Sequence, residues 1–177
     1  MGSALVTAVN GVERPRVALL NIGTESIKGS DTIRSAAALL QKSTINYVGF
    51  VEGDGVFFSD LDVVVCDGFA GNVALKTGEG VAKLIRQFMR EEFDRNLLTR
   101  AGAAAAMPAL KALARRIDPR NYNGASFVGL QGIVIKSHGS ADALSFGNAL
   151  EVALKEIEKD VPTRISSLLA ASGLPTS

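Results

Sequence analysis

The stretch Leu61–Lys76, LDVVVCDGFAGNVALK, decides how the rest of the chain is organised. Its four apolar β-forming residues, Val63 to Cys66, are typical of a short strand that is buried on both faces. A glycine-bearing turn follows this strand, and a long helical pattern follows the turn. A helix that starts in this way presents free backbone N–H groups and the positive end of its dipole. The stretch therefore predicts an anion-binding site.

The turn of this stretch has two interpretations. In the functional one, the backbone at Gly68 and Gly71 and the side chain of Asn72 surround an anion. Lys76 then reaches the same anion, because it lies one helical turn beyond Asn72. In the structural one, the glycines only make the turn, Asn72 caps the helix and Lys76 is a surface lysine. Asp67 either caps a neighbouring group or binds a ligand hydroxyl.

The composition excludes several classes of function. With 19 basic and 18 acidic residues the net charge is +1, so no global field attracts nucleic acid. One cysteine, Cys66, excludes an internal disulfide, and one histidine leaves no Cys/His cluster for zinc. Cys66 extends a buried strand without a base beside it, which predicts a small core residue. We see no signal-peptide layout and no uncharged apolar run that could span a bilayer.

The order of apolar patterns predicts a single α/β domain over residues 1–177. Strands alternate with helices, which favours a mostly parallel sheet covered on both faces. We expect a short helix over residues 1–10 that Gly11 ends, and a second helix capped by Ser30 or Asp31. We also expect strands at 16–21, 45–51, 62–66 and 132–136, a helix that carries apolar residues from Leu144 to Ile157, and a last helix at 163–170 before a loose tail.

Polar, glycine-rich turns follow three of the predicted strands. They begin at Asn21-Ile22-Gly23, at Asp67 and at Lys136, and Glu52 ends a fourth strand. Because the carboxyl ends of parallel strands share one edge of a sheet, we expect these turns to meet and to bind a ligand there. No G-x-G-x-x-G, P-loop or G-x-S-x-G pattern occurs, which disfavours nucleotide binding and serine hydrolysis.

This shared edge would place Lys76, Lys136 and His138 around a small anion. His138 is the only histidine, and it lies in a Ser-His-Gly-Ser turn at a helix entry. It has either a structural or a functional role. Lys136 ends a Val-Ile strand, where a cation is costly unless it reaches solvent or an anion.

The long helix from Asn72 leads into a predicted amphipathic hairpin over residues 93–120. Its apolar stripe is expected to pack in the core or on a second subunit. An Ala-rich segment at 101–107 and Pro108 should break the helix before a second, short one. Residues 95–116 hold five basic residues and no acid, so the tip either packs on protein or lies on an anionic bilayer. The predicted membrane contacts are Leu97, Leu98, Leu110, Leu113, Arg115 and Arg116.

Three separated motifs in a fixed order carry a resemblance to a known family. They are PRVALLNIGTESIKG at 15–29, VVVCDGFAGNVALKTGEG at 63–80 and GLQGIVIKSHGSADA at 129–143. Together they resemble the PlsX phosphate acyltransferases of bacterial phospholipid synthesis, from about residue 1 to about residue 160. Members of that family are about twice as long, and this chain looks like their C-terminal half. Met1 would then be an internal methionine or the start of a truncated chain.

The resemblance implies a three-layer α/β/α fold related to isocitrate dehydrogenases and phosphotransacetylases, in a homodimer with a protruding helical hairpin. It implies that acyl-[acyl carrier protein] and inorganic phosphate react to give acyl phosphate for phosphatidic acid synthesis. It implies no metal and no organic cofactor. The expected location is the cytoplasm, with peripheral contact to the inner face of the membrane. A downstream glycerol-phosphate acyltransferase is an expected partner.

Chemistry and position suggest roles for the candidate site residues in such a reaction. The backbone from Gly68 to Asn72 and Lys76 would hold phosphate, with Asn21, Gly23 and Asp67 nearby. Lys136 and His138 would polarise the thioester carbonyl or protonate the leaving thiolate. Gly139 and Ser140 would offer N–H donors. The alternatives are acyl transfer between phosphate and coenzyme A, as in phosphotransacetylases or phosphotransbutyrylases, and a non-catalytic half that only binds a ligand or partner.

Overall fold

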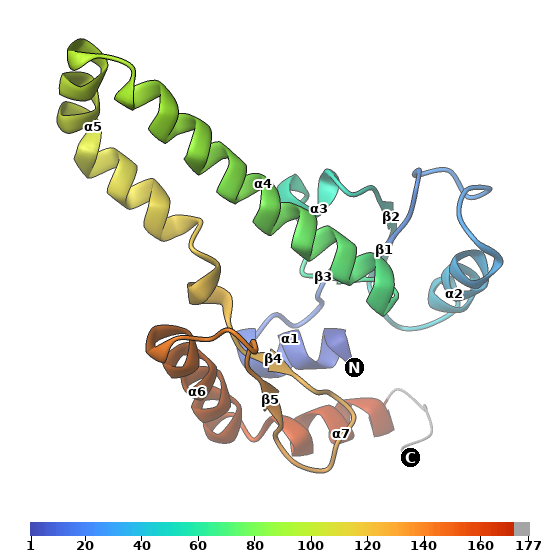
Figure 1. The fold of residues 1–177 in the computed structure, drawn as a ribbon. Helices are drawn as coiled ribbons and strands as arrows, with labels where there is room; N and C mark the ends of the chain where they lie inside the picture. The colour runs from blue at the N-terminus through green and yellow to red at the C-terminus, as the bar shows by residue number, and fades with distance from the viewer. Residues whose placement is uncertain (172–177) are drawn as a thin grey trace.

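The computed structural model describes residues 1–171 as a small parallel sheet, a two-stranded ribbon and a larger number of helices (Figure 1). The helices are α1 Gly2–Asn10, α2 Asp31–Gln41, α3 Gly55–Phe58, α4 Gly68–Asp94, α5 Leu97–Arg116, the 3-10 helix η1 Pro119–Tyr122, α6 Ala143–Glu158 and α7 Val161–Ala171. The strands are β1 Val17–Leu20, β2 Tyr47–Val51, β3 Val63–Val65, β4 Ala125–Ser126 and β5 Ile135–Lys136. The fold is therefore α/β, as predicted, and the loose tail predicted after the last helix lies outside the described residues.

The parallel sheet contains three strands in the order β2-β1-β3. β1 is central, and it pairs with β2 on one side and with β3 on the other, Leu19 lying opposite Val65. The carboxyl ends of β1 and β3 therefore share one edge of the sheet, which confirms the expectation for the turns that start at Asn21 and Asp67.

The prediction of a parallel strand at 132–136 is wrong in both the length of the strand and its partner. Only Ile135–Lys136 forms a strand, β5, and it pairs antiparallel with β4 in a separate ribbon. The segment between Ser126 and Ile135 is too short for the crossover of roughly a dozen residues or more that a parallel pair needs, so β4 and β5 pair antiparallel. Lys136 therefore does not end a strand of the parallel sheet.

Strand β3 is an edge strand and is not buried on both faces, so that prediction is also wrong. Val65 is 43% exposed, and Cys66 is exposed instead of being a core residue. One face of β1 and β3, made by Val17, Leu19, Val63 and Val65, lines an apolar hollow of about 400 Å³ together with α1 and α2. The exposure thus follows from the position of β3 at the edge and from this open face.

Local helix signals are confirmed where they depend on neighbouring residues. Gly11 ends α1 with φ of 73°, and its N–H donates to the carbonyl of Thr7. The Ser30 hydroxyl caps α2 by accepting from the N–H of Ile33. Helix α4 begins at Gly68, earlier than the sequence pattern indicates, because the Asp67 carboxylate caps it.

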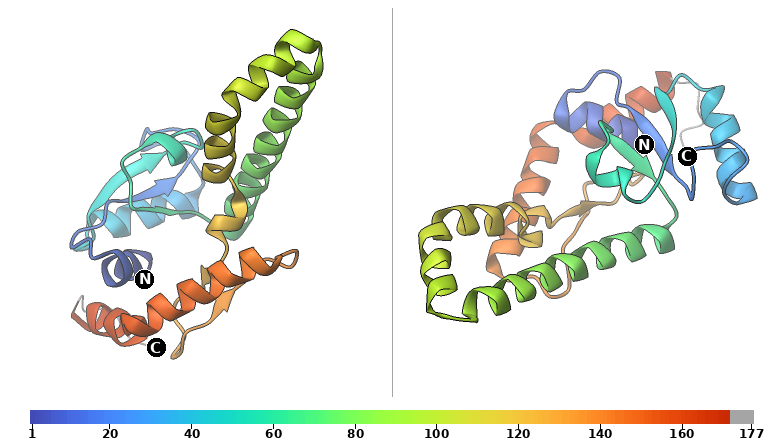
Figure 2. Two further views of the ribbon diagram at one scale, coloured as in Figure 1. Left: turned by 90° about the vertical axis from the view of Figure 1, so that its left-hand side faces the viewer. Right: turned by 90° about the horizontal axis from the view of Figure 1, so that it is seen from above.

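Helices α4 and α5 form a hairpin that projects from the rest of the molecule (Figures 1 and 2). Its turn lies at Arg95 and Asn96, so the predicted break at 101–107 and Pro108 is wrong. Asn96 and Thr99 form a reciprocal capping box that starts α5 at Leu97. Pro108 lies inside α5, and the alanines on the N-terminal side of it have strong helix propensity, which favours a continuous helix.

The best-defined apolar cluster joins the two ends of the described chain. Ala4 and Ala8 of α1 pack against Val161 and Ile165 of α7. The Arg164 guanidinium also donates to the carbonyl of Ala8 over 3.1 Å. The expected core packing of the α4 stripe is not seen in this single chain, since four of its residues are about half exposed: Val81, Leu84, Ile85 and Phe88.

Among residues 1–171, no helix combines the length and the apolarity that crossing a membrane requires.

Candidate functional site

Lys76 and His138 come together in the folded chain. Lys76 lies in α4, His138 lies in the loop between β5 and α6, and 3.1 Å separates Nζ of the lysine from Nε2 of the histidine. The Lys76 ammonium also donates to both carboxylate oxygens of Glu79, over 2.9 and 3.1 Å. This hydrogen bond with Lys76 lowers the pKa of Glu79. A cation and an imidazole thus meet at an exposed position, where an oxyanion can approach both.

The ring of His138 is held from its other nitrogen by Ser140. The backbone N–H of Ser140 donates to Nδ1 over 3.2 Å, and its hydroxyl lies 2.8 Å from the same atom. Ser140 therefore uses its N–H group on the histidine ring, whereas the sequence suggests a donor for a ligand. Gly139 has open space around its Cα, so its conformation is not imposed by close packing.

Asn123 fixes the backbone of the His138 loop, and sequence reasoning missed it. Its Oδ1 accepts from the N–H of His138 over 2.9 Å. Its amide nitrogen donates to the Ser137 hydroxyl over 2.8 Å and to the Ser145 carbonyl over 2.7 Å. One side chain thus ties the end of β5, the histidine loop and the start of α6 together. Its position after Pro119–Tyr122, in a segment that reads as a polar loop, gave no signal of this role.

A cluster of three charged side chains lies between the end of the hairpin and the loop that holds His138. Arg120 binds Asp118 over 2.7 Å and Asp142 over 3.0 Å. Asp142 is the N-cap of α6, and the N–H of Ser145 donates to it. This backbone bond, and then the Arg120 guanidinium, hold the pKa of Asp142 at about 2, below its usual range. Arg120 thereby joins the base of the hairpin to the helix that follows His138.

The start of α4 is already capped by the protein itself. The Asp67 carboxylate accepts from the N–H groups of Phe69 and Ala70, both over 2.9 Å. Of the two roles left open for Asp67, the capping role is thus confirmed. An anion that uses these two N–H groups must displace the Asp67 carboxylate. Lys76, which is paired with Glu79, is the first cationic side chain along this helix. Asn72 is exposed within the first turns of α4.

The space for a side chain is restricted at Gly71 but not at Gly68. A Cβ on Gly71 would lie 2.9 Å from Sγ of Cys66, so the absence of a side chain lets the strand end approach the helix. A Cβ on Gly68 would meet no atom within 4 Å.

Asn21 and Gly23 lie at the same sheet edge as Asp67, but they serve their own loop. Asn21 is 6% exposed and donates to the carbonyl of Lys28 over 3.2 Å. Gly23 is buried, and a Cβ there would lie 2.6 Å from the Glu25 carboxylate. Within residues 1–171, no hydrogen bond or ion pair links this loop to Lys76 or His138.

Lys136 is the member of the predicted cluster that makes no direct polar contact with the other two among the described residues. It is exposed on β5, opposite Ala125, and among the described residues it forms no ion pair or hydrogen bond with Lys76 or His138. In the part of the chain that the structure describes, no group of three or more His, Cys, Asp or Glu side chains is arranged to hold a metal ion.

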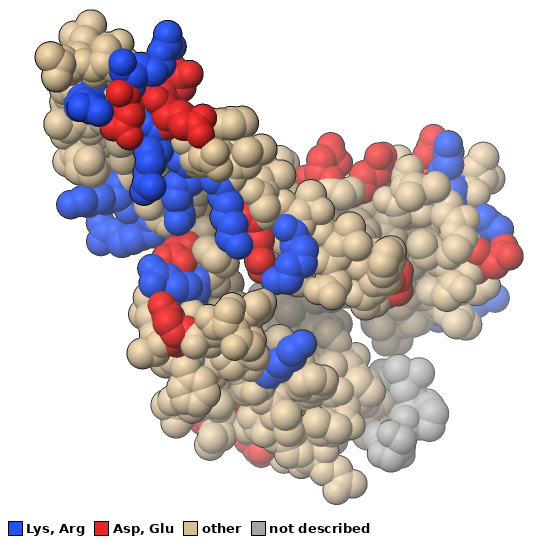
Figure 3. Space-filling view, in the orientation of Figure 1, with Lys and Arg blue, Asp and Glu red and all other residues tan. Residues whose placement is uncertain are grey.

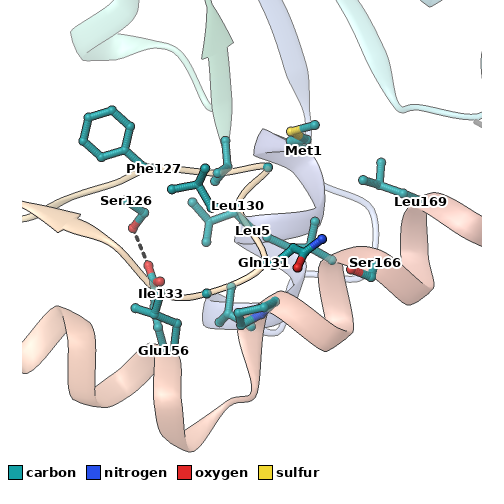
Figure 4. A pocket seen from close by; sticks show the side chains of 16 residues that line it. Met1, Leu5, Ser126, Phe127, Leu130, Gln131, Ile133, Glu156, Ser166 and Leu169 are labelled. Carbon is teal, nitrogen blue, oxygen red and sulfur yellow. Dashed lines mark hydrogen bonds between the residues drawn. The ribbon is translucent and has the colours of Figure 1, made fainter. Parts of the chain in front are cut away.

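A small cavity of about 110 Å³ lies away from this site (Figure 4). Residues of α1, the β4–β5 loop and the α6–α7 region line it, among them Met1, Leu5, Phe127 and Ile165. The buried carboxylate of Glu156 accepts from the Ser126 hydroxyl at its wall. Neither Lys76 nor His138 lines this cavity, so the cavity is separate from the lysine–histidine pair.

The predicted membrane contacts lie at two ends of the hairpin. Leu97 and Leu98 are each 83% exposed beside the turn between α4 and α5. Arg115 and Arg116 end α5, roughly 27 Å further along at about 1.5 Å per residue. Leu110 is partly buried, and Leu113 is exposed on the same helix. The apolar tip and the arginine pair therefore belong to separate surfaces.

Basic side chains gather over the hairpin helices (Figure 3). On α4 and α5 they are Lys76, Lys83, Arg86, Arg90, Arg100, Lys111, Arg115 and Arg116. At the outer end, Arg95 pairs with Glu92 and Arg100 with Asp94, so acidic side chains accompany the basic ones near the turn. The unbalanced positive charge therefore lies toward the base of the hairpin.

The fold and the site define the class of this protein. It is an α/β protein with a small parallel sheet, in which a lysine of α4 contacts the single histidine, located on a glycine-containing loop. The family profile described as "Fatty acid synthesis protein" matches residues 1–164, and the chain belongs to this family. It is 57% identical over 179 residues to a protein of Alkalilimnicola ehrlichii named "Phosphate acyltransferase", covering 99% of this chain and 52% of that protein. A "Phosphate acyltransferase" of Halorhodospira halophila is 56% identical over 176 residues, covering 97% and 51%. The chain thus spans about half the length of the curated relatives it matches.

Proposed function

We propose that this chain carries part of a phosphate acyltransferase site, which forms acyl phosphate from acyl-[acyl carrier protein] and inorganic phosphate. The observation that carries the proposal is the contact between Lys76 and His138, because it joins a cation and a polarising group at one exposed place. The name of the two relatives, "Phosphate acyltransferase", supports the reaction class. The product would serve phospholipid synthesis.

The reaction needs little covalent help from the protein. Phosphate is an oxyanion at neutral pH, and one of its oxygens attacks the thioester carbonyl carbon. The C–S bond then breaks, and the thiolate of the carrier leaves and takes up a proton. The protein must hold phosphate, orient the thioester and stabilise the tetrahedral oxyanion. Lys76 would hold phosphate, with Lys136 and His138 acting at the carbonyl or on the leaving group.

The assembly around this site is part of the same proposal. We place the chain in a three-layer α/β/α fold, related to isocitrate dehydrogenases and phosphotransacetylases, and in a homodimer. The half-exposed apolar stripe of α4 supports a partner surface there. The excess positive charge toward the base of the hairpin would attract the acidic carrier protein. The exposed tip at Leu97 and Leu98 would contact the cytoplasmic face of the membrane, near a downstream glycerol-phosphate acyltransferase.

The first experiment measures acyl phosphate release from palmitoyl-carrier protein and phosphate. This chain alone is compared with the full-length relative of Alkalilimnicola ehrlichii, and each is also given palmitoyl-coenzyme A and acetyl-coenzyme A. Release with the carrier-bound substrate supports the proposal, and a preference for coenzyme A esters overturns it in favour of a phosphotransacetylase-like reaction. If the relative is active and this chain is not, the chain is a half that does not turn over by itself.

A further inference from the structure

One hydrogen bond to the ring of His138 has a fixed direction, and it indicates which ring nitrogen carries the proton. A neutral imidazole has one N–H donor and one acceptor nitrogen, whereas imidazolium has two donors. A backbone N–H can only donate, so the bond from Ser140 N–H to Nδ1 over 3.2 Å requires an unprotonated Nδ1. The Ser140 hydroxyl, 2.8 Å from the same nitrogen, can donate to it as well. The proton of the neutral ring therefore lies on Nε2.

This assignment leaves two donors facing one another at the site. The Lys76 ammonium carries three N–H bonds, and the Glu79 carboxylate accepts from it with both oxygens. Nζ of Lys76 lies 3.1 Å from Nε2 of His138, yet neither an ammonium nor an Nε2–H group can accept a hydrogen bond. An oxygen of an anion that accepts from both groups would resolve this arrangement.

The orientation of the ring also depends on the backbone beneath it. Asn123 accepts from the N–H of His138 over 2.9 Å and donates to the carbonyl of Ser145 over 2.7 Å. These bonds fix the loop relative to α6 at two points. Without them, we expect the ring of His138 to turn away from Lys76 and its Nδ1 to accept from water in place of the Ser140 N–H.

We propose that Ser140 and Asn123 are positioning residues that hold His138 as its Nε2–H tautomer, so that the ring donates a hydrogen bond to the anion beside Lys76. The role of this donor in acyl transfer rests on the proposed function, whereas the tautomer itself does not. The assignment also separates the two tasks left open for His138. Donation to an oxyanion suits the neutral ring, whereas protonating a thiolate would need imidazolium, whose Nδ1–H would oppose the N–H of Ser140.

Nitrogen-15 NMR of the imidazole tests this directly, because the sequence contains one histidine and its ring signals need no assignment. Spectra of the histidine-labelled chain are recorded at a pH where the ring is neutral. We expect the Nε2–H tautomer to dominate. The Nδ1–H fraction should rise in Asn123→Ala, and to a smaller extent in Ser140→Ala, which loses the hydroxyl but keeps the backbone N–H. It should stay low in Ser140→Thr, which keeps both donors. The exposed helix variant Ser35→Ala is the matched control.

Inorganic phosphate is then added, with sodium chloride at equal ionic strength as reference. We expect the Nε2–H signal to shift with phosphate and not with chloride, and the shift to be lost in Lys76→Ala. A dominant Nδ1–H tautomer, or one tautomer ratio shared by the parent chain, Ser140→Ala and Asn123→Ala, overturns the proposal. An Nε2–H signal whose chemical shift does not change with phosphate overturns the part of the proposal that concerns anion binding. Acyl phosphate release is assayed separately, so an inactive chain with the expected tautomer counts against the proposed function alone.

Discussion

Nζ of Lys76 lies 3.1 Å from Nε2 of His138, although 62 residues separate the two in the chain. Each of the two side chains is also hydrogen-bonded to a residue close to it in sequence, Lys76 to Glu79 and His138 to Ser140. The contact therefore joins two locally organised pieces, the first turns of α4 and the loop before α6. With His138 as the proposed Nε2–H tautomer, two donor groups face each other here, which favours an anion between them.

Replacement of Lys76 by alanine should weaken phosphate use strongly. The variant loses a charge next to the expected oxyanion, so we expect acyl phosphate formation to fall on the order of 10²-fold, with a raised KM for phosphate. Initial rates over a range of phosphate concentrations measure this. Lys42→Ala, at the exposed end of α2, serves as the control. Equal rates for Lys76→Ala and the parent chain would exclude Lys76 from the site.

The sequence predicts features that depend on neighbouring residues, because capping is a local interaction. Gly11 and Ser30 end and start helices where their residue types indicate. Asn96 with Thr99 is a local signal of the same kind, and it explains why α5 starts earlier than the alanine-rich segment suggests.

Features that depend on distant pairing were predicted less well. Strand periodicity does not specify a partner, so β5 was assigned to the parallel sheet although it pairs with β4. The apolar run of β3 is compatible with both a central and an edge strand, and the structure places it at an edge. Asn123 shows the limit for the candidate site, since its three bonds reach residues 14, 15 and 22 positions away. The argument from shared strand ends nevertheless selected Lys76 and His138 as neighbours.

The apolar turn of the hairpin should carry membrane binding. Burial of a leucine side chain contributes about 1.5–3 kcal/mol, so Leu97→Asp/Leu98→Asp should lower liposome sedimentation by more than about tenfold. Leu39→Asp is a matched control, because Leu39 is 71% exposed on α2, outside the hairpin. The pair Arg115→Glu/Arg116→Glu should cause a smaller loss, since it lies at the far end of α5. Undiminished binding by the double leucine variant would contradict a membrane contact at this tip.

Two glycines of α4 should respond differently to alanine. A Cβ at Gly80 meets no atom within 4 Å, so Gly80→Ala should raise the free energy of unfolding by up to about 1 kcal/mol through helix propensity. Gly71→Ala should lack this gain, because its Cβ would lie 2.9 Å from Sγ of Cys66. The double variant Cys66→Ala/Gly71→Ala should recover the gain. Urea unfolding measures all three, and identical effects of the two glycine substitutions would show that the Cys66 contact is unimportant.

Asp142 should stabilise the start of α6 in a pH-dependent way. Its pKa in the folded chain is about 2, below the ordinary 3.8, so its contribution is fully present above the ordinary value and is lost as the pH falls through about 2. Asp142→Asn keeps an acceptor for the N–H of Ser145 but loses the charge that binds Arg120. The parent chain should therefore have the higher Tm near neutral pH, and the difference should shrink between about pH 4 and pH 2. Asp142→Ala also loses the cap, so part of its deficit should persist in acid. Thermal unfolding followed by circular dichroism measures these differences, and a constant gap between the parent chain and Asp142→Asn down to the lowest pH would contradict a role for the charge.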